Sequence, residues 1–225
     1  PFTPVAAKSL IDRAAKRDHV MAFKLCTTRG NRAVWALHFK RSMKDVQIGK
    51  SPKFGIWVQA RQHAWESGSS WVCKGLVDWL TAESKESQWL RRGADIFVVP
   101  IMDVDNVAIG AGGKNQVPHD HNRDWLKQPH WRSVEAAQAR IQALDAAGHF
   151  HLFVDLHNPG ATARRPYFYL TPRNLLEPVG QLNLDRFLAA VRRDMTGPLE
   201  FQGETYESGP GYDANWQSIS KNWVS

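Results

Sequence analysis

The stretch Phe54-Gly-Ile-Trp-Val-Gln-Ala60 is an almost continuous apolar run, and a second run of this kind spans Phe150-His-Leu-Phe-Val-Asp-Leu156. Short runs of this composition are typical of strands that are buried on both faces of a sheet. Further strands are expected over 19–27, 33–40 and 96–100. Helical segments lie between the strands, and this alternation predicts an α/β fold with a mixed, largely parallel central sheet and helices on both faces.

The helices are predicted from the spacing of apolar residues. The first begins with Thr3 as its N-cap and Pro4 as its first residue, a combination typical of helix starts. The predicted helices span about 3–16, 69–80, 132–147 and 184–195, and residues 212–224 are weakly helical. The stretch 103–129 is rich in Gly, Asn, Asp and Pro, and has neither a helical nor a strand period. An irregular stretch of this length inside a domain is expected to be functional or disordered.

The size and composition of the chain fit one globular domain. Its 225 residues are 43% apolar, and no apolar run approaches a membrane-spanning length, which is roughly 20 residues. We therefore expect a single domain over residues 1–225 and no membrane partner. The chain opens at Pro1 without a signal-peptide pattern, so we expect the natural start of the protein to be absent.

The net charge bears on the binding partners of the protein, and the cysteines bear on its compartment. The net charge is +7, but the basic residues are scattered among acids and accompany no nucleic-acid-binding motif. This pattern argues against a nucleic-acid partner and favours acidic substrates. Cys26 and Cys73 lack metal-ligand spacing and are expected to be buried thiols. Free thiols favour a reducing compartment, here the cytoplasm.

Candidate metal ligands follow the two buried strands. His63 and Glu66 come just past the first strand, and His157 directly follows the second. Open α/β sheets bind their ligands outside the carboxyl ends of the strands. Two imidazoles and one carboxylate leave a coordination position open, as in catalytic zinc sites, so we predict one zinc ion on these side chains. Taken alone, His63 and Glu66 are also compatible with an ordinary strand-end histidine and a helix-start carboxylate.

A further polar cluster, Asp120-His-Asn-Arg123, lies in the irregular stretch. Asp120 can accept the second N–H of a zinc-binding histidine. Asn122 and Arg123 together can hold a substrate carboxylate, and a solvated loop arginine is the alternative for Arg123. His119 and His121 flank Asp120 and are expected to line a pocket or face solvent rather than to form a second metal site.

Taken in order, these motifs resemble the zinc carboxypeptidases of the carboxypeptidase A type, and are most similar to the cytosolic carboxypeptidase branch. The three motifs are His63-Ala-Trp-Glu66, Asp120-His-Asn-Arg123 and Asp155-Leu-His157. The branch has ARxHPGE followed by SSW, which the chain matches with Ala60-Arg-Gln-His63 and Ser69-Ser-Trp71. Its PxxNPDG and DLNRxW segments are echoed at 100–106 and 120–125, and the resemblance runs from about residue 3 to 160.

The resemblance implies a zinc carboxypeptidase whose partner is the C-terminal tail of a peptide or protein. It implies hydrolysis of the C-terminal peptide bond, or of a side-chain-linked glutamyl bond, with zinc activating a water and a glutamate acting as general base. The implied roles are zinc ligation by His63, Glu66 and His157, support of a zinc histidine by Asp120, and binding of the C-terminal carboxylate by Asn122 and Arg123.

The chain departs from the family pattern in three places. Lys114 stands near the position of a further arginine that polarises the scissile carbonyl, so Lys114 is the candidate for this role. Ala64-Trp65 replaces the Pro-Gly of the first motif. The family's catalytic glutamate follows the third zinc ligand on a late strand, so we expect the general base beyond Ser225 and the domain to be truncated at its C-terminal end.

Two other functions share this residue pattern. A zinc amidohydrolase acting on N-acyl amino acids, similar to aspartoacylase and succinylglutamate desuccinylase, uses the same zinc ligands and a carboxylate-binding Asn-Arg pair. A domain of this fold without its base would be a zinc-binding module that catalyses nothing. Activity on N-acyl amino acids but not on peptides would indicate the first, and the absence of an acidic residue on the strand after Ser225 would indicate the second.

Overall fold

The computed structural model describes residues 1–40, 54–158, 160 and 162–225. Contacts within the chain divide it into two compact units, Pro1–Asn158 and Pro159–Ser225. The first unit contains a five-stranded sheet, and the second contains a pair of short strands. All of the predicted zinc ligands fall in the first unit.

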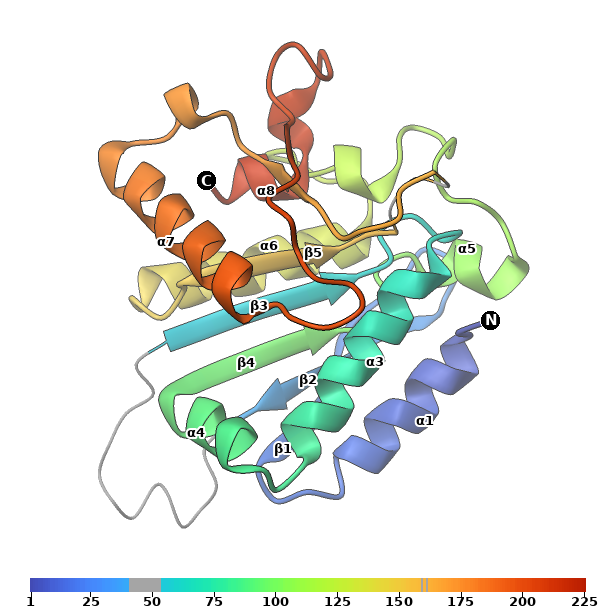
Figure 1. Cartoon of the computed structure of the whole chain (residues 1–225). Helices are drawn as coiled ribbons and strands as arrows, with labels where there is room; N and C mark the ends of the chain where they lie inside the picture. The colour runs from blue at the N-terminus through green and yellow to red at the C-terminus, as the bar shows by residue number, and fades with distance from the viewer. Residues whose placement is uncertain (41–53, 159, 161) are drawn as a thin grey trace. The chain divides into compact units, whose positions relative to one another are not determined.

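The sheet of the first unit has the strand order β1-β2-β4-β3-β5 (Figure 1). Its strands are β1 (Val20–Thr27), β2 (Ala33–Phe39), β3 (Phe54–Ala60), β4 (Ala94–Val99) and β5 (Leu152–Leu156). β2 is antiparallel to both β1 and β4. β3 is parallel to both β4 and β5. The predicted mixed α/β sheet is confirmed, and its parallel part is the part that carries the candidate ligands.

Helices cover both faces of this sheet, as predicted. α1 (Pro4–Ala14) and α3 (Ser67–Thr81) lie on one face and α6 (Arg132–Ala146) on the other (Figure 1). Thr3 caps α1 as expected, because its hydroxyl accepts a hydrogen bond from the Ala6 amide at 3.1 Å.

Two helices of the first unit were not predicted. α5 (Val104–Ile109) lies inside the stretch that was expected to be irregular. It is too short to show an apolar period, and it is set by its ends: the Asp103 side chain caps it, and Gly110 ends it in the left-handed region. α4 (Lys85–Gly93) buries Ser87 and Arg91 on its inner face, so its polar sequence gives no apolar period.

The core of the first unit lies between the sheet and its helices. Trp57 of β3, Leu37 of β2 and Val77 of α3 are completely buried. Cys73 is buried as predicted, whereas Cys26 is half-buried, and both are free thiols. Burial raises the pKa of Cys73 to about 12. The parallel strands are therefore held in a close-packed layer that can fix the side chains at their ends.

The second unit is smaller and more open. Its strands β6 (Phe168–Leu170) and β7 (Thr205–Glu207) are parallel, and its helices are α7 (Pro178–Asp194) and α8 (Ser220–Trp223). α7 begins earlier than predicted because Pro178 supplies a good first turn, and none of its residues is buried. Among the described residues, no helix has both the length and the apolar character needed to cross a bilayer.

Candidate metal centre

The turn that follows β3 carries two of the predicted ligands. Arg61 adopts a left-handed backbone conformation with φ of 61°, which is uncommon for a residue with a side chain. Its guanidinium holds this conformation by donating to the carbonyl oxygens of Ala64 at 2.8 Å and Phe2 at 2.6 Å. The Glu66 amide then donates to the His63 carbonyl at 3.1 Å. The chain therefore reverses over the end of β3, and His63 and Glu66 are presented together.

The third predicted ligand comes from the neighbouring strand. β5 pairs in parallel with β3, with Gln59 opposite Asp155 and Ala60 opposite Leu156. His157 is the first residue after β5. Because parallel strands end at the same edge of a sheet, His157 reaches the turn that holds His63 and Glu66.

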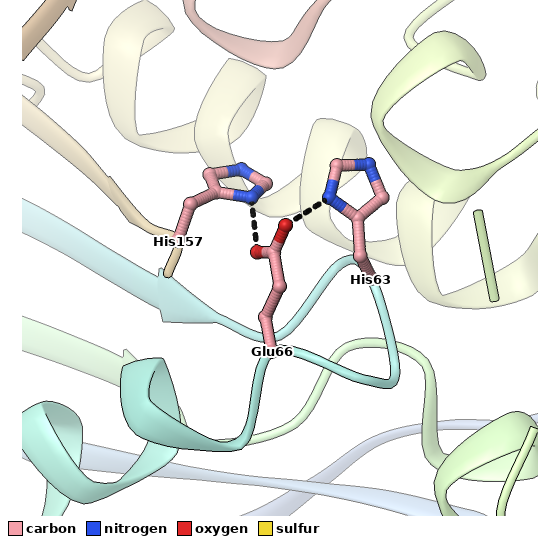
Figure 2. Close-up of side chains that lie close together, drawn as sticks. All are labelled: His63, Glu66 and His157. Carbon is pink, nitrogen blue, oxygen red and sulfur yellow. Dashed lines mark hydrogen bonds and ion pairs between the residues drawn. The ribbon is translucent and has the colours of Figure 1, made fainter. Parts of the chain in front are cut away.

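The three side chains converge on one point (Figure 2). Nδ1 of His63 lies 2.8 Å from Oε1 of Glu66, and Nδ1 of His157 lies 2.6 Å from Oε2 of the same carboxylate. One ligand atom from each residue lies within 4.8 Å of the others. Within the described part of the chain, this is the group of side chains that has the composition and spacing of a metal site.

Each histidine also meets an aspartate with its second ring nitrogen. Nε2 of His63 lies 3.3 Å from Oδ1 of Asp120, and Nε2 of His157 lies 3.0 Å from Oδ2 of Asp155. An ionised carboxylate only accepts hydrogen bonds, so a ring that gives up its Nδ1 proton to bind a metal beside Glu66 keeps its other proton on Nε2, where the aspartate accepts it. The lone pair of Nδ1 is then available to a metal, and for this reason the donor set fits zinc.

The carboxylates of the centre and the His157 imidazole are stabilised as charged groups by their neighbours. Burial alone would raise the pKa of Glu66, but hydrogen bonds from His157 and His63 lower it to about 2. Burial alone would likewise raise the pKa of Asp120, yet His63 and Lys114 lower it to about 2. Asp155 and Glu66 overcome the opposite effect of burial on His157 and raise its pKa to about 10. A metal that binds Nδ1 of His157 must therefore displace a proton.

Lys114 lies behind the His63 ring. Its Nζ is 3.2 Å from Oδ2 of Asp120 and 3.1 Å from Nε2 of His63. These contacts place its ammonium beside the ring nitrogen that points away from Glu66. The predicted role of Lys114 at a substrate carbonyl is therefore open to it only if the ammonium leaves Asp120 and His63.

The predicted carboxylate-binding pair lies in a short 3₁₀ turn, His121–Arg123. The amide of Asn122 comes within 3.3 Å of Nε2 of His157, so Asn122 belongs to the surroundings of the ligands. Nη1 of Arg123 donates to the Asn122 carbonyl at 3.0 Å. Trp65, which replaces the glycine of the family motif, is 63% exposed, and its backbone amide donates to the Gly112 carbonyl at 3.0 Å.

The histidines that flank Asp120 have structural partners. His121 was expected to line a pocket or face solvent, but it is buried and stacks on Trp131 with a ring-centroid distance of 4.9 Å. Burial lowers the pKa of His121 to about 3, so its ring is neutral. His119 is half-buried, and its Nε2 contacts the buried carboxylate of Asp124.

Three residues of the centre were given no role from the sequence, although Asp155 stands in the Asp155-Leu-His157 motif. Asp155 binds the outer nitrogen of His157, Gln62 donates to Asp155, and Trp125 donates to Gln62 at 2.7 Å. An aspartate inside an apolar strand, two residues before a histidine, was the available signal for Asp155. No pattern in the sequence connects Gln62 with Trp125.

These features define a protein with a mixed α/β sheet and a candidate metal centre at the ends of its parallel strands. The chain belongs to the zinc carboxypeptidase family, whose sequence profile matches residues 8–222. The curated relatives that it matches include cytosolic carboxypeptidase 3 of Bos taurus, 28% identical over 135 residues, or 59% of this chain and 13% of that protein. Cytosolic carboxypeptidase 6 of Caenorhabditis elegans is 29% identical over 141 residues, or 58% of this chain and 30% of that protein.

Solved structures show the same fold. A metallo-carboxypeptidase from Burkholderia cenocepacia superposes with a TM-score of 0.78 at 20% identity, and covers 100% of this chain and 57% of its own. A metallo-carboxypeptidase from Pseudomonas aeruginosa, in complex with (2-guanidinoethylmercapto)succinic acid, has a TM-score of 0.75 at 24% identity, covering 100% and 56%. The chain thus spans little more than half of these structures and less of the curated relatives.

Proposed function

We propose that the chain forms part of the catalytic domain of a zinc-dependent metallocarboxypeptidase. In this proposal one zinc ion binds Nδ1 of His63, Nδ1 of His157 and the Glu66 carboxylate. The observation that carries it is the orientation of the two rings: both turn Nδ1 toward Glu66, and both have an aspartate at Nε2. Membership of the zinc carboxypeptidase family supports it.

The proposed reaction is hydrolysis of the C-terminal peptide bond or of a side-chain-linked glutamyl bond. A zinc ion at this position supplies Lewis acidity, which polarises a carbonyl group and lowers the pKa of water. Asn122 and Arg123 bind and orient the terminal carboxylate of the substrate. Asp120 and Asp155 keep the two imidazoles in the tautomer that leaves Nδ1 free. Lys114 is the candidate cation for the substrate carbonyl, and the general base is predicted beyond Ser225.

The proposed substrate is the C-terminal tail of a peptide or protein, with a preference for acidic residues. The net charge of +7 supports this preference, because it favours the approach of acidic chains. The cytoplasm is the proposed compartment, supported by the two free cysteines and by the names of the curated relatives. The family match favours neither the deacylase nor the zinc-binding module without activity.

We also propose that residues 1–225 belong to a single catalytic domain. The family profile matches residues 8–222, and so runs through both compact units. The structural neighbours likewise align with 100% of this chain. In this proposal the two units are parts of one fold rather than separately folding domains.

The proposed function is tested in two steps. Elemental analysis of the purified chain should find one zinc per molecule, which is absent after dialysis against a chelator. A longer chain that includes the predicted base should release C-terminal residues from peptides only when zinc is present, and faster from acidic tails than from neutral ones. Zinc-dependent cleavage of N-acyl amino acids but not of peptides would contradict the proposal.

A further inference from the structure

A buried chain of hydrogen bonds leads from the core of the first unit to His157. Nε1 of Trp125 donates to Oε1 of Gln62 at 2.7 Å, and Nε2 of Gln62 donates to Oδ2 of Asp155. The same carboxylate oxygen lies 3.0 Å from Nε2 of His157. Gln62 is 0% exposed and Trp125 is 1% exposed, so water cannot replace either partner.

The direction of each hydrogen bond in this series follows from the Trp125 indole at its start. An indole N–H only donates, so the Gln62 amide must present its oxygen to Trp125. The amide nitrogen of Gln62 is then turned to Asp155, which as a carboxylate only accepts. His157 must therefore donate from Nε2, and its Nδ1 is the nitrogen left for a metal.

The hydrogen bonds from Trp125 to His157 also join the two segments that carry the metal ligands. Trp125 packs edge-on against Phe153 of β5 at a centroid distance of 5.8 Å, and β5 ends at His157. Gln62 directly precedes His63. A single side-chain amide therefore connects the turn after β3 with the residue that orients the ligand after β5.

We propose that Gln62 is a positioning residue for the metal centre: its amide, held by Trp125, keeps the Asp155 carboxylate on the outer nitrogen of His157. This inference rests on the proposed zinc site. It concerns a position that the family motif leaves unspecified, since Gln62 stands at the x of ARxH. Groups that orient a metal-binding histidine typically contribute 10–100-fold to metal affinity.

The chain offers a matched control in a second buried glutamine–tryptophan pair. Gln59 is 0% exposed, and its Oε1 accepts from Nε1 of Trp57 at 2.9 Å. Among the described residues, Nε2 of Gln59 has no hydrogen-bond partner, and so this amide does not hold Asp155. Gln59→Met thus removes an equally buried amide from the same part of the sheet without breaking the chain to His157.

The test is the zinc affinity of the protein, measured by competition with a chromophoric chelator. We expect Gln62→Met to bind zinc about 10-fold more weakly than the unaltered protein, and Gln59→Met to bind it equally well. In an Asp155→Asn background, Gln62→Met should weaken binding by no more than about twofold further, because its effect passes through Asp155. If Gln62→Met does not fold, Trp125→Phe removes the indole N–H together with part of the buried ring, and zinc binding should weaken by about threefold or more.

The visible absorption spectrum of the cobalt-loaded protein separates positioning from general loss of structure. A changed orientation of His157 alters the ligand field, so the Gln62→Met spectrum should differ from that of the unaltered protein and of Gln59→Met. Zinc binding by the unaltered protein, with unchanged affinity and spectrum in Gln62→Met, would overturn this inference alone. A folded, unaltered protein that binds no zinc would overturn the proposed function and this inference with it.

Discussion

His63 and His157 both turn Nδ1 toward Glu66 and Nε2 toward an aspartate, but different groups hold the two aspartates. Asp120, behind His63, meets the Lys114 ammonium at 3.2 Å, and the Lys114 side chain is 35% exposed. Asp155, behind His157, meets the neutral amide of the fully buried Gln62. The group that holds Asp120 is thus a partly exposed cation, which we call the ionic support. The group that holds Asp155 is a neutral amide with no exposed surface, which we call the neutral support.

This difference matters because the two supports respond to different changes. An ion pair with one partly exposed member is weakened by salt, although less than a fully exposed pair. A buried hydrogen bond between neutral and charged groups is insensitive to salt, and loss of one partner leaves the other unsatisfied. A second group also faces the outer nitrogen of each ring: the Lys114 ammonium lies 3.1 Å from Nε2 of His63, and the neutral Asn122 amide lies 3.3 Å from Nε2 of His157.

Substitution of a zinc-binding histidine should have the greatest effect on zinc affinity, because it removes a ligand and not only a group that orients one. His63→Ala and His157→Ala should each weaken zinc binding by more than about 100-fold, because each removes a direct ligand. Isothermal titration with zinc measures this loss. His38→Ala is the control, because His38 also has a carboxylate at Nε2, Asp95 at 2.8 Å, but lies outside the ligand group. Zinc affinity that survives either ligand substitution would place the metal elsewhere.

Substitution of the two aspartates should have a smaller effect on zinc affinity, and it compares the two supports directly. Asp155→Asn should weaken zinc binding by roughly 10–100-fold, and Asp120→Asn by less, because Lys114 already neutralises part of the Asp120 charge. Competition with a chelator gives both affinities, and Asp95→Asn, which alters the carboxylate on His38, should leave them unchanged. A larger loss for Asp120→Asn than for Asp155→Asn would reverse the comparison.

Substitution of Lys114, which alters the ionic support alone, should change zinc affinity least. Lys114→Met should bind zinc as tightly as the unaltered protein or up to about threefold more tightly at low salt, because one cation near the site is removed. This gain should shrink as salt is raised, whereas the loss in Gln62→Met should not. Lys74→Met is the matched control, since Lys74 pairs with Asp78 on α3 and its side chain is 33% exposed. Weaker zinc binding by Lys114→Met at every salt concentration would contradict this electrostatic account.

The strands that carry the ligands could be predicted because each is a short apolar run with a definite end. β3 spans the predicted residues Phe54–Ala60, and β5 ends at Leu156 as expected. The parallel pairing of β3 and β5 then brings His63, Glu66 and His157 together, which the rule for ligand sites in α/β sheets anticipates. The α4 and α5 helices were missed because caps and buried polar groups, rather than an apolar period, define them.

The outer part of the centre could not be predicted, for a different reason. The bond between Trp125 and Gln62 joins residues far apart in the chain, and either residue alone is a common core residue. The position of Lys114 behind His63 depends on the path of the loop that follows α5, which no periodicity describes. Metal ligands at strand ends leave a local signal in the sequence, whereas the groups that orient them leave none.

The most direct test of the account is a zinc-loaded crystal structure with anomalous scattering data collected at the zinc edge. One anomalous peak is expected, about 2.0–2.1 Å from Nδ1 of both His63 and His157 and within coordinating distance of the Glu66 carboxylate. Asp120 and Asp155 should remain on Nε2 of the two rings. A peak on Nε2 of either ring, or a single peak at any other group of side chains, would contradict the proposed centre.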